Sequence, residues 1–253
     1  PSLAGCLNKI AGTVAAVPIR MYKRETNRIT EVLDDNRIVL LNSETGDTLD
    51  AYQMKRAVIL DYFLGRGGYI FIDKVKNEIR SLRYVSEKNI SFNENPDVIF
   101  KDYDILVQGN TYKPYQFIRL LRNTEDGAKG KSIIEENEGL LRVAYNSLKF
   151  EETLVSTGGN KKGFIKSPRK LSQTAIDALK DAWRNLYSNN TESVVILNEG
   201  LDFQEASNTS VEMQLNENKK TNGDEICKVM GIPPSLLNGN AGEQDEKNFI
   251  KYE

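Results

Sequence analysis

The sequence predicts an α+β protein whose mixed first half is followed by two long helices with a compact β–α–β unit inserted between them. Three observations lead to this fold class. Helical patterns and short β-like runs share residues 1–130, long helical patterns open at Ser132 and Thr209, and a strand–helix–strand pattern fills residues 158–208. A substantial core is possible, because 39% of the 253 residues are hydrophobic.

Composition excludes several functional classes. The chain has 34 basic and 36 acidic residues, and a net charge of −2 gives no overall attraction to nucleic acid or to an anionic membrane. It has no histidine, which excludes Ser-His-Asp and Cys-His catalysis and histidine-ligated metals. Cys6 and Cys227 are far apart in sequence, and we interpret them as reduced structural thiols. No apolar run approaches the length of a membrane-spanning helix.

The first half, residues 1–130, alternates helical and extended patterns. A helix is predicted over Ser2–Val17, ended by Pro18, and a strand over Ile19–Arg24. A second helix is predicted to begin near Asp47 and to end at the glycine turn that starts at Gly65. A meander of hairpins is predicted from the runs Tyr69–Val75, Ile79–Val85, Val98–Phe100, Ile105–Val107 and Tyr115–Leu121.

The second half is organised around two long helices. Ser132 and Glu135 form a capping-box pattern that opens a helix over Ser132–Thr157, roughly 39 Å long. A second capping box, Thr209 with Glu212, opens a helix that ends before Gly231-Ile-Pro-Pro234.

Between these helices lies the β–α–β unit. Its strands are predicted at Gly163–Lys166, Val194–Leu197 and Leu201–Gln204. Its helix follows Ser172, an N-cap bracketed by Leu171 and Ile176 as a hydrophobic staple.

The middle of the last long helix carries the first candidate functional residues. The stretch from Asn216 to Glu225 has no apolar side chain, so it must face solvent, a cavity or a partner. Lys219 and Lys220 lie within it, among acidic residues. They are either members of ordinary i,i+4 charge pairs or part of a channel wall of mixed charge.

A basic loop supplies the second set of candidates. Five basic residues fall within ten positions: Lys161, Lys162, Lys166, Arg169 and Lys170. They could contact DNA phosphates or an acidic protein partner, or form a solvated loop, and the sequence favours neither.

No catalytic, cofactor or metal site is predicted. Gly158–Gly163 resembles the start of a phosphate-binding loop, but Phe164 and Ile165 stand where Lys and Ser/Thr are required. Gly65–Ile70 lacks the last glycine of a dinucleotide fingerprint and precedes a strand. The carboxylates are scattered, and none of them is marked as a catalytic pair.

Several short passages follow one another in a characteristic order along nearly the whole chain. They are Val17–Tyr22, Tyr69–Ile72, Gly130–Ile133, Gly158-Gly159, Val194–Leu201 and Glu225–Pro234. Their order resembles that of portal proteins of tailed bacteriophages, of the HK97 type that is widespread in prophages. Gly231-Ile-Pro-Pro234 is the most specific of these passages.

The resemblance implies an assignment of parts. Residues 1–130 would be a wing, 131–157 and 209–232 two stem helices, 158–208 a clip, and 233–253 the start of a channel-helix region. Members of this family continue through a channel-facing helix and a crown, so the resemblance implies a C-terminally truncated chain.

The resemblance also implies a function. Members form a ring, usually of twelve subunits, at one vertex of the capsid, and double-stranded DNA passes through its channel during packaging and ejection. The implied partners are further copies of the chain, the terminase large subunit, the major capsid or scaffold protein, and a head-completion or adaptor protein. The protein would be made in the bacterial cytoplasm and reside in the virion, with no membrane contact, no cofactor and no enzymatic activity.

The alternatives are a basic nucleic-acid-binding or adaptor module and a carboxylate-dependent hydrolase.

Overall fold

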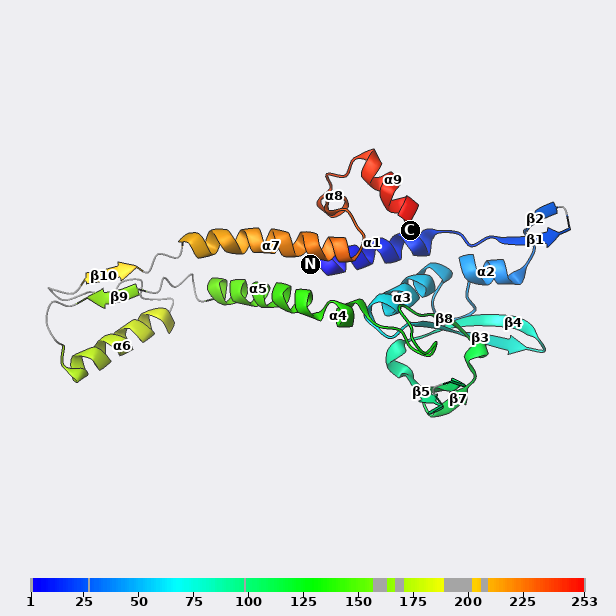
Figure 1. Ribbon diagram of the computed structural model, residues 1–253, viewed down its shortest axis with the longest axis horizontal. Coiled ribbons are helices and arrows are strands. Elements are labelled where there is room, and N and C mark those ends of the chain that lie inside the picture. The colour runs from blue at the N-terminus through cyan, green and yellow to red at the C-terminus, as the bar shows by residue number, and fades with distance from the viewer. Residues whose placement is uncertain are drawn as a thin grey trace. The chain divides into compact units, whose positions relative to one another are not determined.

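The computed structural model describes residues 2–26, 28–97, 99–156, 163–166, 171–188, 202–205 and 209–252. The chain divides into two units, one made of residues 1–141 and 223–253 and the other of residues 142–222. Helices and strands are mixed throughout, which confirms the predicted α+β class (Figure 1).

Helices α1 and α3 pack against each other in the first unit. Helix α1 spans Ser2–Ala16, close to its prediction, and α3 spans Ala51–Leu64. The start of α3 is set by Asp50, whose carboxylate accepts the backbone N–H of Gln53 at 2.7 Å, and not by Asp47 as predicted. Between the two helices lie β1 (Met21–Glu25), β2 (Arg28–Val32) and α2 (Asn36–Asn42), of which only β1 was predicted.

A three-stranded antiparallel sheet, ordered β4-β3-β8, packs against α3 in the first unit. Its strands are β3 (Gly68–Val75), β4 (Glu78–Val85) and β8 (Phe117–Leu120). Because side chains alternate along β3, Ile70 packs with Met54 and Val58 of α3, whereas Tyr69 belongs to a different buried cluster. The run predicted as a strand from Tyr115 begins with a 3₁₀ turn, Pro114–Gln116.

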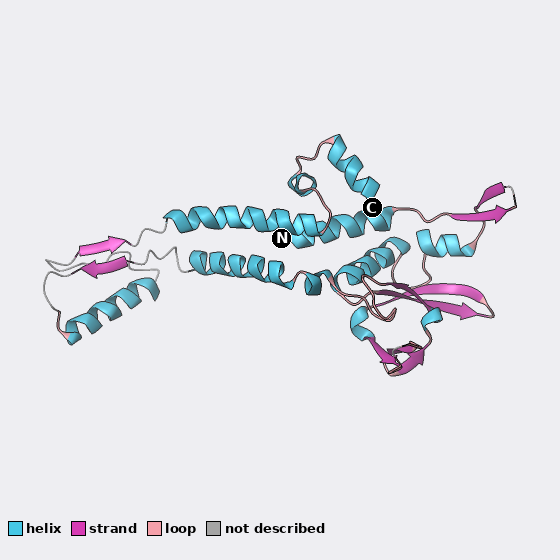
Figure 2. Ribbon diagram, in the orientation of Figure 1, coloured by secondary structure: helices cyan, strands magenta, loops and turns pink. Residues whose placement is uncertain are grey.

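A second antiparallel sheet, ordered β5-β6-β7, completes this part of the first unit (Figure 2). Its strands are β5 (Ile90–Glu94), β6 (Tyr103–Val107) and β7 (Asn110–Tyr112), and Ile90 and Ile105 pack with Tyr69 and Phe117. The predicted strand at Val98–Phe100 is wrong for Ile99 and Phe100, and Val98 lies outside the described residues. The Asp97 carboxylate accepts the backbone N–H groups of Ile99 and Phe100 at 2.8 and 3.0 Å, which holds these two residues in a turn.

The first long helix is interrupted near its start. Ser132 caps it as predicted, with its hydroxyl accepting the N–H of Glu135 at 3.1 Å. However, α4 covers only Ile133–Glu136, and α5 begins again at Glu138 and runs to Ser156. The helix is broken at the intervening Asn137, whose φ of −120° and ψ of 30° are not helical and whose side-chain amide also donates to the carbonyl of Ile133, so the predicted continuous helix is wrong at this residue. Thr157 lies outside the described residues.

The second unit contains the whole inserted segment, residues 158–208. Strand β9 (Gly163–Lys166) pairs antiparallel with β10 (Asp202–Glu205), and α6 covers Gln173–Ser188. Ser172 caps α6 as predicted, accepting the N–H of Ala175 at 3.3 Å. The predicted strand at Val194–Leu197 lies outside the described residues.

Helix α7 (Thr209–Val229) ends at the glycine turn that the sequence predicts. Gly231 has φ +68°, the left-handed conformation that glycine adopts without strain. The N–H of Ile232 reaches the carbonyl of Cys227 at 2.9 Å, and that of Gly231 reaches Lys228 at 3.1 Å, as in a Schellman motif. Two further helices follow, α8 (Pro234–Asn238) and α9 (Glu243–Tyr252).

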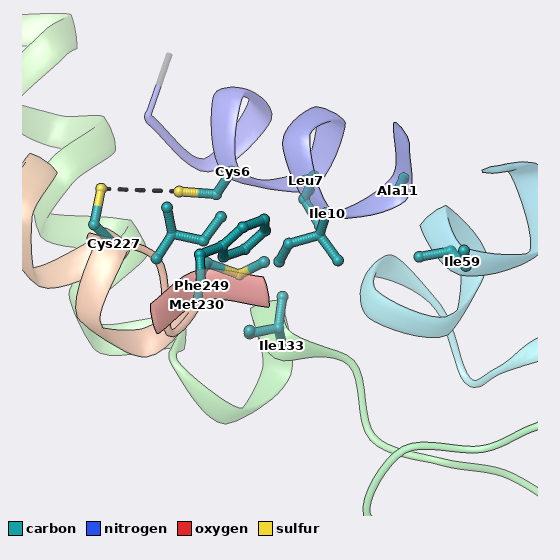
Figure 3. Close-up of a cluster of buried hydrophobic side chains, with 10 residues drawn as sticks. Cys6, Leu7, Ile10, Ala11, Ile59, Ile133, Cys227, Met230 and Phe249 are labelled. Carbon is teal, nitrogen blue, oxygen red and sulfur yellow. Dashed lines mark hydrogen bonds between the residues drawn. The ribbon is translucent and has the colours of Figure 1, made fainter. Parts of the chain in front are cut away.

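The principal core of the first unit joins the two ends of the chain. Cys6, Leu7 and Ile10 of α1 pack with side chains from α3, α4, the end of α7 and α9 (Figure 3). The partners from these elements are Ile59, Ile133, Cys227, Met230, Ile232 and Phe249. Burying each large aliphatic or aromatic side chain contributes about 1.5–3 kcal/mol, so this cluster is a major source of stability.

Gly68 gives a test of the packing between α3 and the sheet. A Cβ atom at this position would lie 2.3 Å from the backbone oxygen of Val58 and 2.6 Å from its Cγ1. We expect Gly68→Ala to lower the free energy of unfolding by about 1–3 kcal/mol in urea titrations. Gly139→Ala is the matched control, because nothing lies within 4 Å of its added methyl group. Equal stability of the two variants would contradict the described contact.

Candidate functional surfaces

Helix α5 exposes apolar side chains along its described length. Val143, Tyr145 and Phe150 are 56%, 65% and 45% exposed. By helical spacing Val143 and Phe150 share one side of α5, while Tyr145 lies on the opposite side, next to the half-buried Leu141. A helix that leaves a valine and two aromatic side chains in water is typical of a surface that another molecule covers.

The polar middle of α7 carries the two candidate lysines. The described side chains from Glu217 to Thr221 are all exposed, as predicted from the absence of apolar residues. The Nζ atom of Lys219 lies 2.9 Å from one carboxylate oxygen of Glu151 on α5 and 3.2 Å from the other. Lys219 therefore links two helices instead of pairing along its own helix. Lys220, the next residue, is exposed as well.

The predicted basic loop cannot be assessed in the same way. Lys161, Lys162, Arg169 and Lys170 lie outside the described residues. Lys166 is the last residue of β9, and its side chain also lies outside what the structure describes. The structure therefore does not test whether these five basic side chains lie close to one another.

Five carboxylates in the described regions have a shifted pKa, and in each of them the pKa lies below its ordinary value. Hydrogen bonds from Arg37 lower the pKa of Asp35 to about 2, and the backbone N–H groups of Phe100 and Ile99 lower the pKa of Asp97. In Asp126 burial acts in the opposite direction and is outweighed by backbone N–H groups.

These shifts do not favour the hydrolase alternative. A general acid needs a raised carboxyl pKa near neutral pH, and none of the resolved carboxyl shifts in the described regions has that direction. Within the same regions, no cluster of three or more Cys, Asp or Glu side chains could hold a metal ion. None of the helices in these regions is long and apolar enough to cross a bilayer.

Two thiols that are distant in sequence meet in the core. The Sγ atoms of Cys6 and Cys227 lie 3.8 Å apart, and both side chains are free and buried (Figure 3). Burial, reinforced by the neighbouring Cys227, raises the pKa of the Cys6 thiol to about 12. The interpretation as structural thiols agrees with this environment, but the contact itself has no signal in the sequence.

The comparisons of this chain with known proteins all match portal proteins. The family model for "Phage portal protein" matches residues 1–253. A probable portal protein of Streptomyces phage phiC31 is 24% identical over 150 residues, which are 55% of this chain and 32% of that protein. The chain thus spans about a third of the length of this curated relative.

Solved structures show the same fold. A portal protein of the HK97 family from Corynebacterium diphtheriae matches with a TM-score of 0.59 at 12% identity, covering 90% of this chain and 72% of the other. A chain in the neck of a native gene transfer agent particle, computed with C12 symmetry, matches with a TM-score of 0.61 at 16% identity, covering 99% and 72%.

The ion pair between α5 and α7 gives a stability test. Lys219 and Glu151 are partly exposed, so we expect a double-mutant cycle of Lys219→Ala with Glu151→Ala to yield a coupling of about 0.2–1 kcal/mol, reduced in high salt. The cycle of Lys220→Ala with Glu151→Ala is the control and should yield none. Equal coupling in both cycles, measured by urea unfolding, would show that the pair does not form in solution.

The buried thiols give a reactivity test. At pH 8 the Cys6 thiol should stay protonated and both sulfurs are buried, so dithionitrobenzoate should react with neither Cys6 nor Cys227 in the native protein. Both should react rapidly in guanidinium chloride. Fast reaction of one thiol in the native state would place that residue at an accessible surface, against the described core.

Proposed function

Because the chain belongs to the phage portal protein family, we propose that it is a structural, non-enzymatic subunit of the ring at one vertex of a phage capsid. Double-stranded DNA passes through the channel of this ring during packaging and ejection. The observation that carries the proposal is the family match over residues 1–253, supported by similarity in fold to a chain in a twelve-fold symmetric particle neck.

The parts of the chain have distinct roles in this proposal. Residues 1–130, with their two three-stranded sheets and the β1-β2 pair, form the wing, and 131–157 and 209–232 form the stem helices. Residues 158–208 form the clip, and 233–253 begin the channel-helix region. The supporting observation for the stem is that α5 and α7 are joined through Glu151 and Lys219.

Helix α5 supplies surface for contacts between subunits. Its exposed Val143, Tyr145 and Phe150 have no reason to face water in an isolated subunit. Since a closed ring uses two different surfaces of each subunit, an apolar side of α5 can be covered by the next copy.

Helix α7 supplies a surface over which DNA can slide. Between Glu217 and Glu225 two lysines stand among three acidic residues, so the helix is polar but nearly neutral. A strongly basic channel would hold DNA tightly, because each neutralised phosphate releases counterions. The mixed charge around Lys219 and Lys220 therefore suits passage better than retention.

The clip meets other proteins in this proposal. The basic set Lys161, Lys162, Lys166, Arg169 and Lys170 is the candidate contact for an acidic partner surface or for DNA phosphates. The proposed partners are the terminase large subunit, the major capsid or scaffold protein, and a head-completion or adaptor protein. The assembled protein would reside in the virion.

Ring formation is the direct test. Size exclusion with light scattering and negative-stain microscopy should show closed rings of roughly twelve copies of the 28.6 kDa chain. We expect Val143→Ser combined with Phe150→Ser to weaken ring assembly at least tenfold, because these side chains would be covered in the ring.

Lys149→Ser is the matched control, since it changes another exposed residue of α5 without removing apolar surface. It should leave assembly unchanged. A wild-type chain that stays monomeric or forms only two-fold dimers at every concentration would contradict the proposed function.

A further inference from the structure

Strands β1 and β2, with the residues that flank them, form an arm that spans residues 19–33 in the first unit. The two strands pair antiparallel, with Met21 opposite Val32 and Tyr22 opposite Glu31. Among the described strands, neither pairs with any other, and Figure 1 shows them beyond α2, away from the two three-stranded sheets. An isolated two-stranded ribbon is marginally stable in water, so this arm needs a partner on at least one face.

The two faces of the arm differ in how they are covered. Met21 and Val32 share one face and are half-buried, and the Met21 sulfur accepts a hydrogen bond from Arg37 of α2. Tyr22 lies on the opposite face, where Ile29 is its diagonal neighbour across the strand pair. Tyr22 and Ile29 are 55% and 66% exposed, and Leu33, directly after β2, is 76% exposed.

Further exposed apolar side chains lie next to this face. Val17 and Ile19, which lead from α1 into the arm, are also exposed. Each large side chain that a partner covers contributes about 1.5–3 kcal/mol, so a neighbour that covers several of them would gain substantial free energy. Several exposed apolar side chains within one short segment indicate an interaction site.

The charge of the arm indicates what kind of surface covers it. Residues 19–33 contain four basic and two acidic side chains. Arg20 pairs with Glu31 at 3.7 Å and Lys23 with Glu25 at 3.0 Å, whereas Arg24 and Arg28 are exposed without an ion pair to any described residue. The partner surface should therefore combine apolar and acidic groups.

The same unit carries a second, acidic segment that packs on α1. Residues 223–249 contain five acidic side chains against Lys228 and Lys247. The end of α7 and α8 lie near the beginning of α1, where Cys6 meets Cys227 and Gly5 lies next to Leu237, and α9 packs farther along α1 through Phe249. We call this segment the acidic face; its acidic residues are Asp224, Glu225, Glu243, Asp245 and Glu246, of which Glu243 pairs with Lys247 and Asp245 accepts a hydrogen bond from Ser235.

We propose that the basic, apolar arm of one copy docks on the acidic face of the next copy of this chain. The arm and the acidic face are different parts of the same unit: the arm follows the last turn of α1, and the acidic face packs along α1. Head-to-tail contacts that close a ring require two such surfaces, while a two-fold dimer would need one self-complementary patch. Exposed Val229 provides apolar contact within the acidic face.

The inference rests on the proposed ring, so its test uses the wild-type assembly as the reference. Arg24→Glu with Arg28→Glu should raise the concentration for half-assembly at least tenfold in mass photometry, without changing the melting temperature. Adding Glu243→Lys and Glu246→Lys to the same chain should restore assembly, because the opposite charges would again face each other between copies.

Lys74→Glu with Lys76→Glu is the matched control, since it reverses two exposed charges at the β3–β4 hairpin of the same unit. It should assemble like the wild type. Normal assembly of the arm variant, or weakened assembly that the changes in α9 fail to restore, would overturn the inference.

A second measurement keeps the two proposals separable. A photoreactive phenylalanine analogue at position 22 should cross-link to peptides from residues 223–249 of another copy, whether or not the ring closes. Absence of such a cross-link would overturn the docking of the arm. Absence of wild-type rings together with this cross-link would overturn the ring alone.

Discussion

The packing of the start of α1 against the end of α7 is the contact on which most of the first unit depends. It brings together Cys6 and Cys227, which are 221 positions apart in sequence, and adds Met230, Ile232 and Phe249 to the same core. Closing so long a loop costs conformational entropy, and burial of these apolar side chains offsets that cost. The left-handed turn at Gly231 is what returns the chain to this core after α7.

The side chains of α7 are polar and exposed in the middle of the helix and buried at its end, and this difference links the fold to the proposed function. From Ile226 onward it presents buried side chains to the core, whereas Glu217–Thr221 are exposed and polar. A helix of this kind is anchored at one end and free to meet solvent or DNA along the rest. The uncovered apolar sides of α5 and of the arm have the opposite requirement, because they need protein contacts that a single subunit does not provide.

The features that the sequence predicts well are those set by neighbouring residues. The cap at Ser132 and the glycine turn at Gly231 depend on side chains within a few positions, and both are confirmed. The errors occur where one polar side chain decides between alternatives, as Asp97 does for Ile99 and Phe100 and Asn137 does between α4 and α5. The pairing of Lys219 with Glu151 joins residues 68 positions apart, so the local charge pattern could not reveal it.

A cryo-electron microscopy reconstruction of the assembled protein tests the central claim most directly. The account predicts a closed ring with rotational symmetry, in which the polar stretch of α7 faces the central channel and the apolar side chains of α5 are covered by neighbouring subunits. A two-fold dimer, or a ring in which Lys219 and Lys220 are buried between subunits while Val143 and Phe150 face the channel, would contradict it.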